Sequence, residues 1–377
     1  MDTHRSKIAS WLDQSAGSTL LGVCPNTRLV TTAAIRVSAE LSAPIMFAAT
    51  LNQVDQNIGY TGWTPVSLVE FVTEQCSQIG IDPLPVCLDH GGPKQKDEHA
   101  GLSFDDSLRV VRESIEACIL AGYQLIHVDC SKRRHPNEIV DQLIDRTVDL
   151  IGFAHSTCKE HNLQAVDYEI GTDDLDGKVT DEADFEYFLS STFERLRELR
   201  LPKPVFVVAQ VGTSLENSSL DTRLTAQLVA VARRHGTTLK CHFADYTANP
   251  SVFPEIGVSG ANVGPEFSAA QYDAIGLGTS IEAKLVVDEV SAAVVRSNLW
   301  KKWLLPDEGA EFDSLTRERQ RFLLKNCSRY VWTSGAVARA LQALFHRDPR
   351  YEDFVISHIM LAIERYVQAF GLAGLAR

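Results

Sequence analysis

Short apolar segments alternate with longer amphipathic segments along the first 290 or so residues of the chain. The short segments have the length of β-strands, and the longer ones carry apolar residues at helical spacing. Parallel strands need a long crossover between them, so this alternation predicts repeated β-α units. The predicted strands are 20–24, 44–49, 84–88, 125–129, 165–170, 205–210, 238–243 and 260–263.

Eight β-α units over roughly 260 residues predict an α/β fold of the TIM (β/α)8 barrel type. The clearest helical segments between the strands are 103–121, 137–159, 181–199 and 222–235. After about residue 290 the strand signal ends, while helical spacing continues in 314–325, 334–346 and 351–370. We therefore expect a barrel domain over 1–289 and a helical C-terminal extension over 290–377.

Composition and charge narrow the range of partners. The formal net charge of the 377 residues is -13, whereas binding to nucleic acid needs clustered lysine and arginine. No segment approaches the roughly 20 apolar residues of a membrane span, and the first residues lack the apolar core of a signal peptide. The eight cysteines are scattered without a Cys-x-x-Cys pair. We expect a cytoplasmic protein with reduced, buried cysteines and a small polar substrate.

Polar residues stand at seven consecutive predicted strand ends, from the second strand to the eighth. Active sites of TIM barrels lie at the carboxyl ends of the strands. Any one of these residues alone has an ordinary explanation, such as capping a helix, but the complete ring favours a functional site. Its members are Asn52, Gln53, Asp89, His90, Asp129, Glu169, Gln210, His242, Asp245 and Asn262.

Two histidines and several carboxylates in this ring favour a divalent metal, with zinc first and manganese or cobalt as alternatives. His90 and His242 are the candidate ligands, with Gln210 as a neutral oxygen donor. Glu169 is a candidate carboxylate ligand and also a candidate catalytic residue. An ion with open positions polarises a carbonyl and stabilises an enediolate. Asp89 is then the candidate acid and base. The alternative for both histidines is a core position with a hydrogen bond to a carbonyl.

The fourth strand and the segment after it contain further candidates. Asp129 is a candidate catalytic carboxylate, whereas His127 lies one layer deeper on the same strand face and fits core packing better than function. Directly after this strand, Ser131, Lys132 and Arg133 are candidates to bind the substrate, and the cations suit a phosphate or carboxylate. A solvated basic turn is the alternative. The other candidate substrate contacts are Asn52, Gln53, Gln210, Asp245 and Asn262.

Several stretches together resemble one known family. They are ATLNQVDQNIGYTGWTP, LDHGGP, AGYQLIHVDCS, EIGTDD, VVAQVGT, CHFADY and ANVGPEF, which cover most of the predicted barrel. In this order they resemble the class II tagatose-bisphosphate aldolase non-catalytic subunits, whose members have also been labelled tagatose-6-phosphate kinases. The sequence has no glycine-rich phosphate loop of the kinase kind, so we set the kinase label aside.

That family is similar in turn to the class II fructose-bisphosphate aldolases, zinc-dependent TIM barrels that act through an enediolate. The resemblance implies that Asp89 is the catalytic acid and base, that His90, His242 and Glu169 bind zinc, and that Asn262 contacts the substrate. Two departures stand out. This chain has Gln210 where the aldolases have a further histidine, and FADY follows His242 where they have a glycine-rich phosphate loop.

The carboxylate ligand has a competing candidate. Many relatives place a glutamate three residues after the isoleucine of the fifth strand, where this chain has Asp173. Glu169 continues the apolar alternation of its strand and should lie at the barrel rim. Asp173 and the neighbouring Asp174 fall in an acidic, glycine-containing loop, which favours solvent exposure for both.

Two functions remain open from the sequence. One is a metal-dependent aldolase or C4-epimerase for a ketose, ketose phosphate or sugar acid, since retro-aldol cleavage and re-addition inverts the carbinol carbon. The other is a non-catalytic subunit that stabilises a separate aldolase chain. An apolar surface around Phe354, Ile356, Ile359 and Met360 is the candidate docking site for that chain, although these positions also fit burial against the barrel. A homo-oligomer is a further expectation.

Overall fold

The strands pair in sequence order and close into a parallel eight-stranded barrel, which confirms the predicted TIM-barrel fold. The first and last strands complete the closure, with Leu21 opposite Ala261 and Gly22 opposite Asn262. The computed structural model describes residues 6–132, 139–171 and 180–376. Its strands are β1 Leu20–Val23, β2 Ile45–Thr50, β3 Val86–Gly91, β4 Leu125–Val128, β5 Asp167–Gly171, β6 Phe206–Val208, β7 Thr238–Cys241 and β8 Gly260–Val263.

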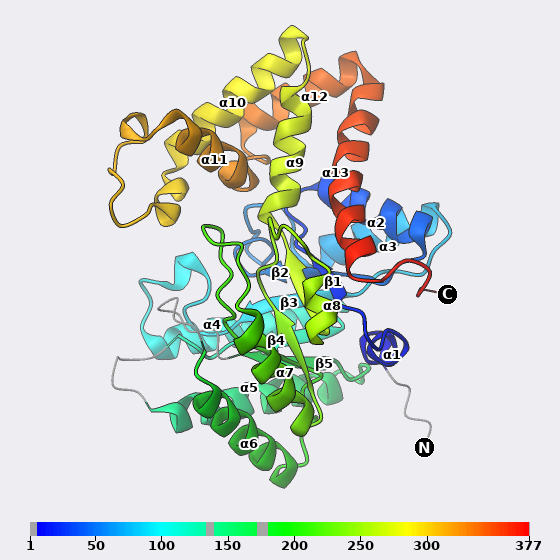
Figure 1. Cartoon of the computed structure of the whole chain (residues 1–377), viewed down its shortest axis with the longest axis vertical. Helices are drawn as coiled ribbons and strands as arrows, with labels where there is room; N and C mark the ends of the chain where they lie inside the picture. Colours follow the sequence, from blue (N-terminus) through cyan, green and yellow to red (C-terminus); the bar gives the residue numbers. More distant parts are fainter. Residues whose placement is uncertain (1–5, 133–138, 172–179, 377) are drawn as a thin grey trace.

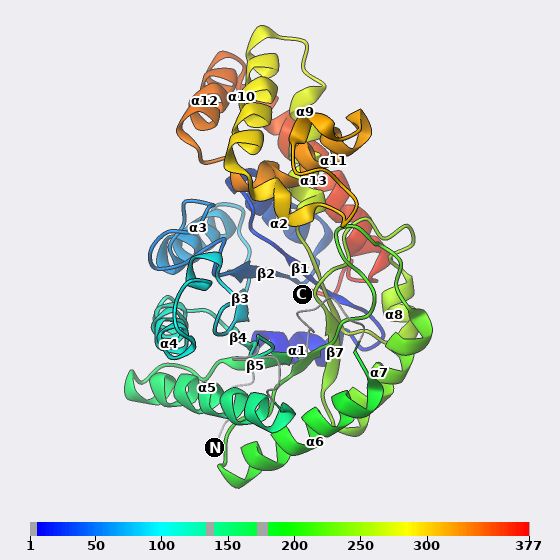
Figure 2. The ribbon, with the colours of Figure 1, turned by 90° about the vertical axis from the view of Figure 1, so that its left-hand side faces the viewer.

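The helices that follow the strands surround the barrel (Figures 1 and 2). Short polar side chains begin several of them, as at Thr27, Ser103 and Asp221, each of which accepts a hydrogen bond from a first-turn N–H group. The helices of this part are α1 Lys7–Gln14, α2 Arg28–Leu41, α3 Pro65–Gln78, α4 Phe104–Leu120, α5 Val140–Glu160, α6 Glu182–Glu198, α7 Thr222–Arg234, α8 Val252–Ile256 and α9 Pro265–Gly276, with a short η1 turn at Asp97–His99. The predicted start of α5 at residue 137 lies outside the described residues.

After β8 the described chain is helical, as the sequence predicts. Helix α13 packs against α2 and α9, while α10, α11 and α12 extend beyond the barrel (Figure 1). The predicted domain boundary at 289/290 falls inside α10, and the division into two domains stays a prediction. These elements are α10 Ile281–Ser297, η2 Leu299–Trp303, η3 Phe312–Ser314, α11 Arg317–Cys327, η4 Ser328–Tyr330, α12 Gly335–Arg347 and α13 Pro349–Ala369.

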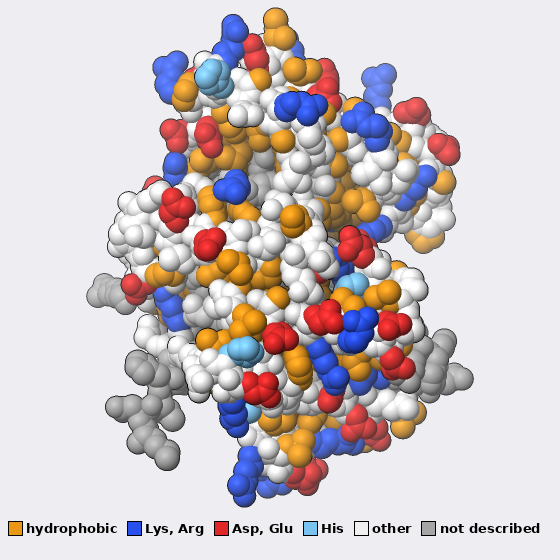
Figure 3. All heavy atoms as spheres, turned by 180° about the vertical axis from the view of Figure 1, so that it is seen from behind, with side chains coloured by type: hydrophobic (Ala, Val, Ile, Leu, Met, Phe, Trp, Pro, Cys, Tyr) orange, Lys and Arg blue, Asp and Glu red, His pale blue; other side chains and the backbone are white. Residues whose placement is uncertain are grey.

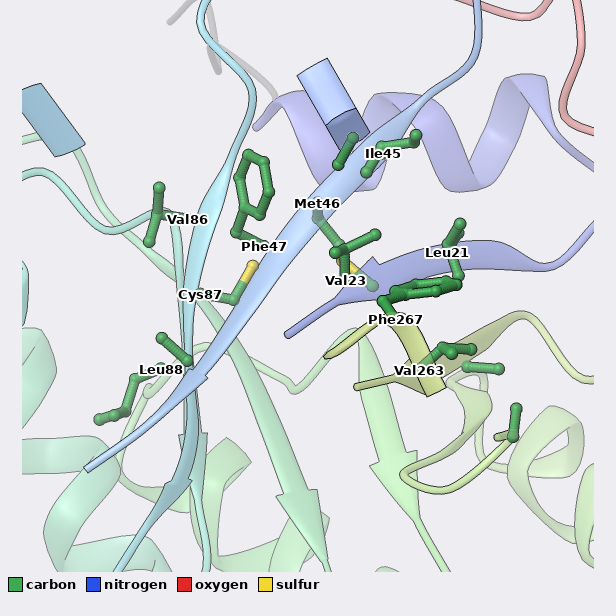
Figure 4. Close-up of a cluster of buried hydrophobic side chains, with 14 of the residues drawn as sticks. Leu21, Val23, Ile45, Met46, Phe47, Val86, Cys87, Leu88, Val263 and Phe267 are labelled. Atoms are coloured by element: carbon green, nitrogen blue, oxygen red, sulfur yellow. The ribbon is translucent and has the colours of Figure 1, made fainter. Parts of the chain in front are cut away.

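Apolar side chains from neighbouring strands and from α9 fill the space between barrel and helices (Figure 4). Leu21, Met46 and Phe267 are among them, and all three are almost fully buried. Burying one such side chain contributes about 1.5–3 kcal/mol. Ile356, Ile359 and Met360 on α13 belong to the same core, whereas Phe354 is exposed. Burial is thus the correct alternative for three of the four positions proposed as a docking surface.

The cysteines agree with the expectation of reduced, mostly buried side chains. All eight cysteines lie in the described part of the chain and none forms a disulfide; seven are buried and Cys24 is half-buried. Basic and acidic side chains are interspersed on the face seen in Figure 3, without a continuous basic area. None of the described helices combines the length and the apolar character that crossing a membrane requires.

Candidate active site

The end of β3 has an irregular backbone, and the side chains of both Asp89 and His90 reach the same cluster. The register with β4 shifts between Leu88 and Gly91, and His90 has a left-handed backbone with φ of 52°. Its N–H group donates to Nδ1 of the buried His127 over 3.1 Å. A Cβ atom at Gly92 would lie 1.5 Å from the carbonyl oxygen of Asp129, so only glycine fits there. The glycines after Asp89 and His90 therefore allow the two strands to approach closely.

Three donor atoms from β3 and from the residue after β7 converge at this point. The Nδ1 atom of His242 lies 3.2 Å from Nε2 of His90 and 3.5 Å from Oδ1 of Asp89, and the remaining side of the triangle measures 4.0 Å. A tetrahedral zinc ion with bonds of about 2.0–2.1 Å has ligand atoms about 3.3 Å apart. The 3.2 Å between the two histidine nitrogens therefore fits two ligands of one divalent metal, with the Asp89 carboxylate beside them. His127 belongs to the same cluster: one ring nitrogen of His127 lies within 4.8 Å of a ligand atom of each of the other three residues.

Asp129 lies behind His90 and orients its ring. Its Oδ2 atom is 2.6 Å from Nδ1 of His90 and accepts a second hydrogen bond from Nε2 of Gln95, also over 2.6 Å. The backbone N–H of Ser131 donates to Oδ1 over 3.0 Å, and the Ser131 hydroxyl group contacts the same atom. With Nδ1 engaged, Nε2 of His90 is the nitrogen that faces the cluster. A catalytic role for Asp129 stays a prediction, and these contacts favour positioning.

The ring of His242 is held in the same way by a buried ion pair between Glu169 and Lys240. The sequence predicts Glu169 at the site but not Lys240. The Nε2 atom of His242 lies 2.5 Å from Oε1 of Glu169, and Nζ of Lys240 donates to Oε2 of Glu169 over 2.7 Å. Glu169 and Lys240 are both fully buried. Lys240 stands opposite Gly260, whose missing side chain leaves room for it. The signal for Lys240 was its place two residues before His242, on the same face of an apolar strand.

The charges of the cluster keep its carboxylates ionised despite their burial. Burial opposes ionisation, but Lys240, followed by the facing imidazoles, lowers the pKa of Glu169 to about 2. His242 and His90 likewise hold the pKa of Asp89 well below its ordinary value. Burial alone would lower the pKa of Lys240, yet the charge of Glu169 raises it. Both oxygens of Glu169 have partners already, and its role as a metal ligand stays a prediction.

Asn262 connects β8 to the cluster. Its Nδ2 atom donates to Oδ2 of Asp89 over 3.2 Å, while its buried Oδ1 atom has no hydrogen-bond partner among the described residues. A Cβ atom at Gly22 would lie 2.1 Å from this Oδ1 atom. Gly22 therefore makes room for Asn262, and Asn262 orients the oxygen of Asp89 that faces away from the histidines.

A pocket of about 200 Å³ opens beside the two histidines. Gln210 and the segment after β6 line one side, and Trp303 of η2, which the sequence analysis did not single out, lines another. The Oε1 atom of Gln210 accepts the N–H of Gly212 over 2.9 Å. Gln210 thus lies at the predicted site, and its role as a metal ligand or substrate contact stays a prediction.

Three other predicted residues form hydrogen bonds that stabilise loops near the strand ends. Gln53 accepts the N–H of Thr50 and donates to Asn26, and Asn52 accepts the N–H of Asp97 over 3.0 Å. Asp245 accepts N–H groups at the start of α9. Their roles as substrate contacts stay predictions.

The segments after β4 and β5 are described only in part. Lys132 is half-buried after β4. Arg133, Asp173 and Asp174 lie outside the described residues, so the choice between Glu169 and Asp173 as the carboxylate ligand stays a prediction.

These features define a parallel β/α barrel with a candidate metal centre of imidazole and carboxylate groups at the carboxyl ends of its strands. The chain belongs to the GatZ/KbaZ-like family of D-tagatose-1,6-bisphosphate aldolase subunits, whose family model matches residues 6–362. The resemblance noted from the motifs is therefore confirmed.

Solved structures share the fold at low sequence identity. A probable tagatose 6 phosphate kinase from Sinorhizobium meliloti 1021 is 20% identical, with a TM-score of 0.73 over 93% of this chain and 100% of the other. The fructuronate-tagaturonate epimerase UxaE from Cohnella laeviribosi is 13% identical, with a TM-score of 0.58 over 94% and 81%. A fructose-bisphosphate aldolase from Campylobacter jejuni is 13% identical, with a TM-score of 0.55 over 97% and 93%.

Proposed function

We propose that this protein is a metal-dependent enzyme that acts on a ketose or ketose phosphate by retro-aldol chemistry, as an aldolase or as a C4-epimerase. The observation that carries the proposal is the convergence of His90 Nε2, His242 Nδ1 and Asp89 Oδ1, each supported from behind by a buried polar group. Membership of the tagatose-bisphosphate aldolase subunit family supports the substrate class. The names of the epimerase and the aldolase that share the fold agree with it.

His90 and His242 would hold the divalent ion, zinc first and manganese or cobalt as alternatives, with Glu169 and Gln210 as further predicted ligands. Bound there, a divalent ion polarises the carbonyl of a ketose. The protein's own part is to fix both rings: Asp129 engages Nδ1 of His90, and Glu169 engages Nε2 of His242. Each ring then presents its other nitrogen to the cluster.

Asp89 is the residue that moves the proton in this proposal. It lies beside both histidines, and Asn262 fixes its second oxygen. As a carboxylate it takes the proton from the C4 hydroxyl group while the C3–C4 bond breaks, which leaves an aldehyde and an enediolate. Returning the proton to the C4 oxygen after re-addition to the other face of the aldehyde gives the C4 epimer. Transfer of a proton to C3 of the enediolate, followed by release of the two fragments, gives aldol cleavage.

The anionic end of a substrate would lie toward Lys132 and Arg133, after β4. The small pocket at Trp303 would receive the neutral, hydroxyl-bearing part of the chain. Because Trp303 lines this pocket beside polar groups, contact between its ring and a sugar fits this proposal. Sugar acids use the same cations as sugar phosphates, so both stay within the proposed substrate class.

The first test combines metal analysis with turnover. We expect the purified protein to contain a transition metal and to convert at least one of fructose 6-phosphate, tagatose 6-phosphate, their bisphosphates or the related ketoses and uronates. His90→Ala should lower both metal content and activity, whereas Asp89→Asn should keep the metal and lower turnover by about 100-fold or more. His161→Ala, an exposed histidine, is the matched control.

Loss of metal in Asp89→Asn would make this carboxylate a ligand and contradict its assignment as acid and base. Full metal content in His90→Ala would contradict the proposed centre.

The second candidate is a non-catalytic subunit, which the family description of an aldolase subunit favours. It predicts that neither zinc nor manganese gives turnover in the isolated chain, and that the chain copurifies at fixed stoichiometry with a separate aldolase. Turnover by the isolated chain would exclude this candidate.

A further inference from the structure

A second and larger cavity lies outside the cluster at the strand ends. It has a volume of about 1140 Å³ and lies between the start of α2, the loop before α3, the buried face of α9 and the helices α12 and α13. None of its described lining residues lines the pocket beside His90 and His242. The proposed aldol chemistry therefore leaves this cavity unused.

Gln271 of α9 lines this cavity with an unsatisfied hydrogen-bond donor. The side chain is fully buried, and its Oε1 atom accepts the hydroxyl group of Thr27 over 2.6 Å. Its Nε2 atom has no partner among the described residues. Because a buried polar group without a partner is unfavourable, this amide indicates a missing acceptor at the cavity.

The start of α2 adds further donors to the same place. The first N–H groups of a helix have no partners within it, and they carry the positive end of its dipole. Thr27 satisfies the N–H of Val30. The next two residues of the first turn, Arg28 and Leu29, line the cavity. The first turn of this 14-residue helix contains no acidic side chain that would neutralise it.

Two arginines from different helices, α2 and α12, add positive charge to the lining. Arg28 lies over the rings of Phe71, at 5.0 Å, and Trp63, at 5.7 Å, which hold its guanidinium group in place. Arg339 comes from α12. Neither arginine forms an ion pair with a described residue, in a chain with a net charge of -13. Glu352 is the one carboxylate among the described lining residues, so the positive charges exceed the negative.

We propose that this cavity is a second ligand site, for a small molecule that carries a phosphate group. The phosphate accepts hydrogen bonds from Gln271 Nε2 and the first turn of α2, and pairs with Arg28 and Arg339. The rest of the ligand lies against Leu341 and Phe345 of α12, since apolar side chains make up much of the lining.

The test is calorimetric titration of the full chain with inorganic phosphate and with pyrophosphate, at constant ionic strength set with chloride. We expect saturable binding that Arg339→Ala weakens about tenfold or more, as expected for loss of a charge-assisted contact. Gln271→Met, which keeps the volume and removes the amide donor, should weaken binding as well. Arg350→Ala is the control, because this arginine is exposed on α13 and lies outside the cavity lining.

A parallel series separates this site from the barrel mouth. Lys132→Ala and His90→Ala should leave the affinity for phosphate at the second site unchanged. Absence of saturable binding, or equal affinity of wild-type protein and Arg339→Ala, would overturn the proposal. Binding that is lost in Lys132→Ala and kept in Arg339→Ala would place the anion at the mouth and overturn it too. None of these outcomes depends on turnover, so failure here is distinct from failure of the proposed enzyme function.

Discussion

Lys240 shows how much of the site depends on a residue that touches no substrate in our proposal. It neutralises Glu169, and Glu169 fixes the ring of His242. Removing one partner of a buried ion pair leaves the other charge uncompensated, which typically costs about 3–5 kcal/mol. We therefore expect Lys240→Met to lower the free energy of unfolding by roughly that amount, measured by urea denaturation.

A double variant separates charge from packing. Lys240→Met combined with Glu169→Gln leaves no buried charge behind, so it should be more stable than Lys240→Met alone. If both variants are equally unstable, lost packing rather than the unpaired carboxylate explains the effect. The double variant should also bind zinc more weakly than wild-type protein, because a neutral amide holds the His242 ring less firmly.

Residue by residue, the sequence predicts positions better than contacts. Asp89, His90 and His242 meet because parallel strands bring their carboxyl ends to one rim, which alternation alone predicts. The sequence does not reveal the left-handed backbone of His90, which accompanies the hydrogen bond from its N–H group to His127 on the neighbouring strand β4. Lys240 escaped notice because lysine is seldom fully buried.

At the scale of elements, the start of helix α9 is held by the buried carboxyl group of Asp245. Asp245 accepts the N–H groups of Gly264 and Glu266 and is fully enclosed. Burial raises its pKa to about 7, although the hydrogen bonds from these backbone N–H groups oppose the shift. A carboxyl group whose pKa is raised in the folded state stabilises the fold when protonated. Its contribution is complete below about pH 4 and is lost as the pH rises through 7.

We expect wild-type protein to lose about 2 kcal/mol more stability than Asp245→Asn between pH 5 and pH 8. The asparagine stays neutral and still offers an oxygen to the start of α9. Urea denaturation of both proteins at the two pH values measures the difference. Equal losses would mean that Asp245 is ionised throughout this range in the folded protein.

The periodicity of apolar residues predicts the helices and strands, because each of these elements buries one face. The helical segments after β8 followed in the same way, but their place against the barrel did not. The contact between α13 and α2 joins segments about 300 residues apart in sequence, and no local pattern encodes such a pairing.

At the scale of the whole molecule, the C-terminal helices support one wall of the proposed site. Arg319 of α11 forms two parallel bonds to Glu216, of 2.9 and 3.0 Å, and a third to Glu308 of 2.7 Å. Glu216 directly follows the segment that lines the pocket beside His242. We expect Arg319→Ala to destabilise this segment by roughly 1–2 kcal/mol.

Hydrogen exchange over residues 211–221 measures this effect. Exchange there should become faster in Arg319→Ala and stay unchanged in Arg317→Ala, an exposed neighbour on the same helix. Unchanged exchange in Arg319→Ala would mean that the segment is held by its own hydrogen bonds.

The position of Trp303 in the chain also has a consequence for biosynthesis. Ribosomes deliver a chain from its N-terminus, and folding begins while synthesis continues. His90 and His242 precede Trp303 by 213 and 61 residues, so both histidines emerge from the exit tunnel before the wall that encloses them. A nascent chain arrested after β8 should therefore present these imidazoles to cellular metal carriers more openly than the finished protein does.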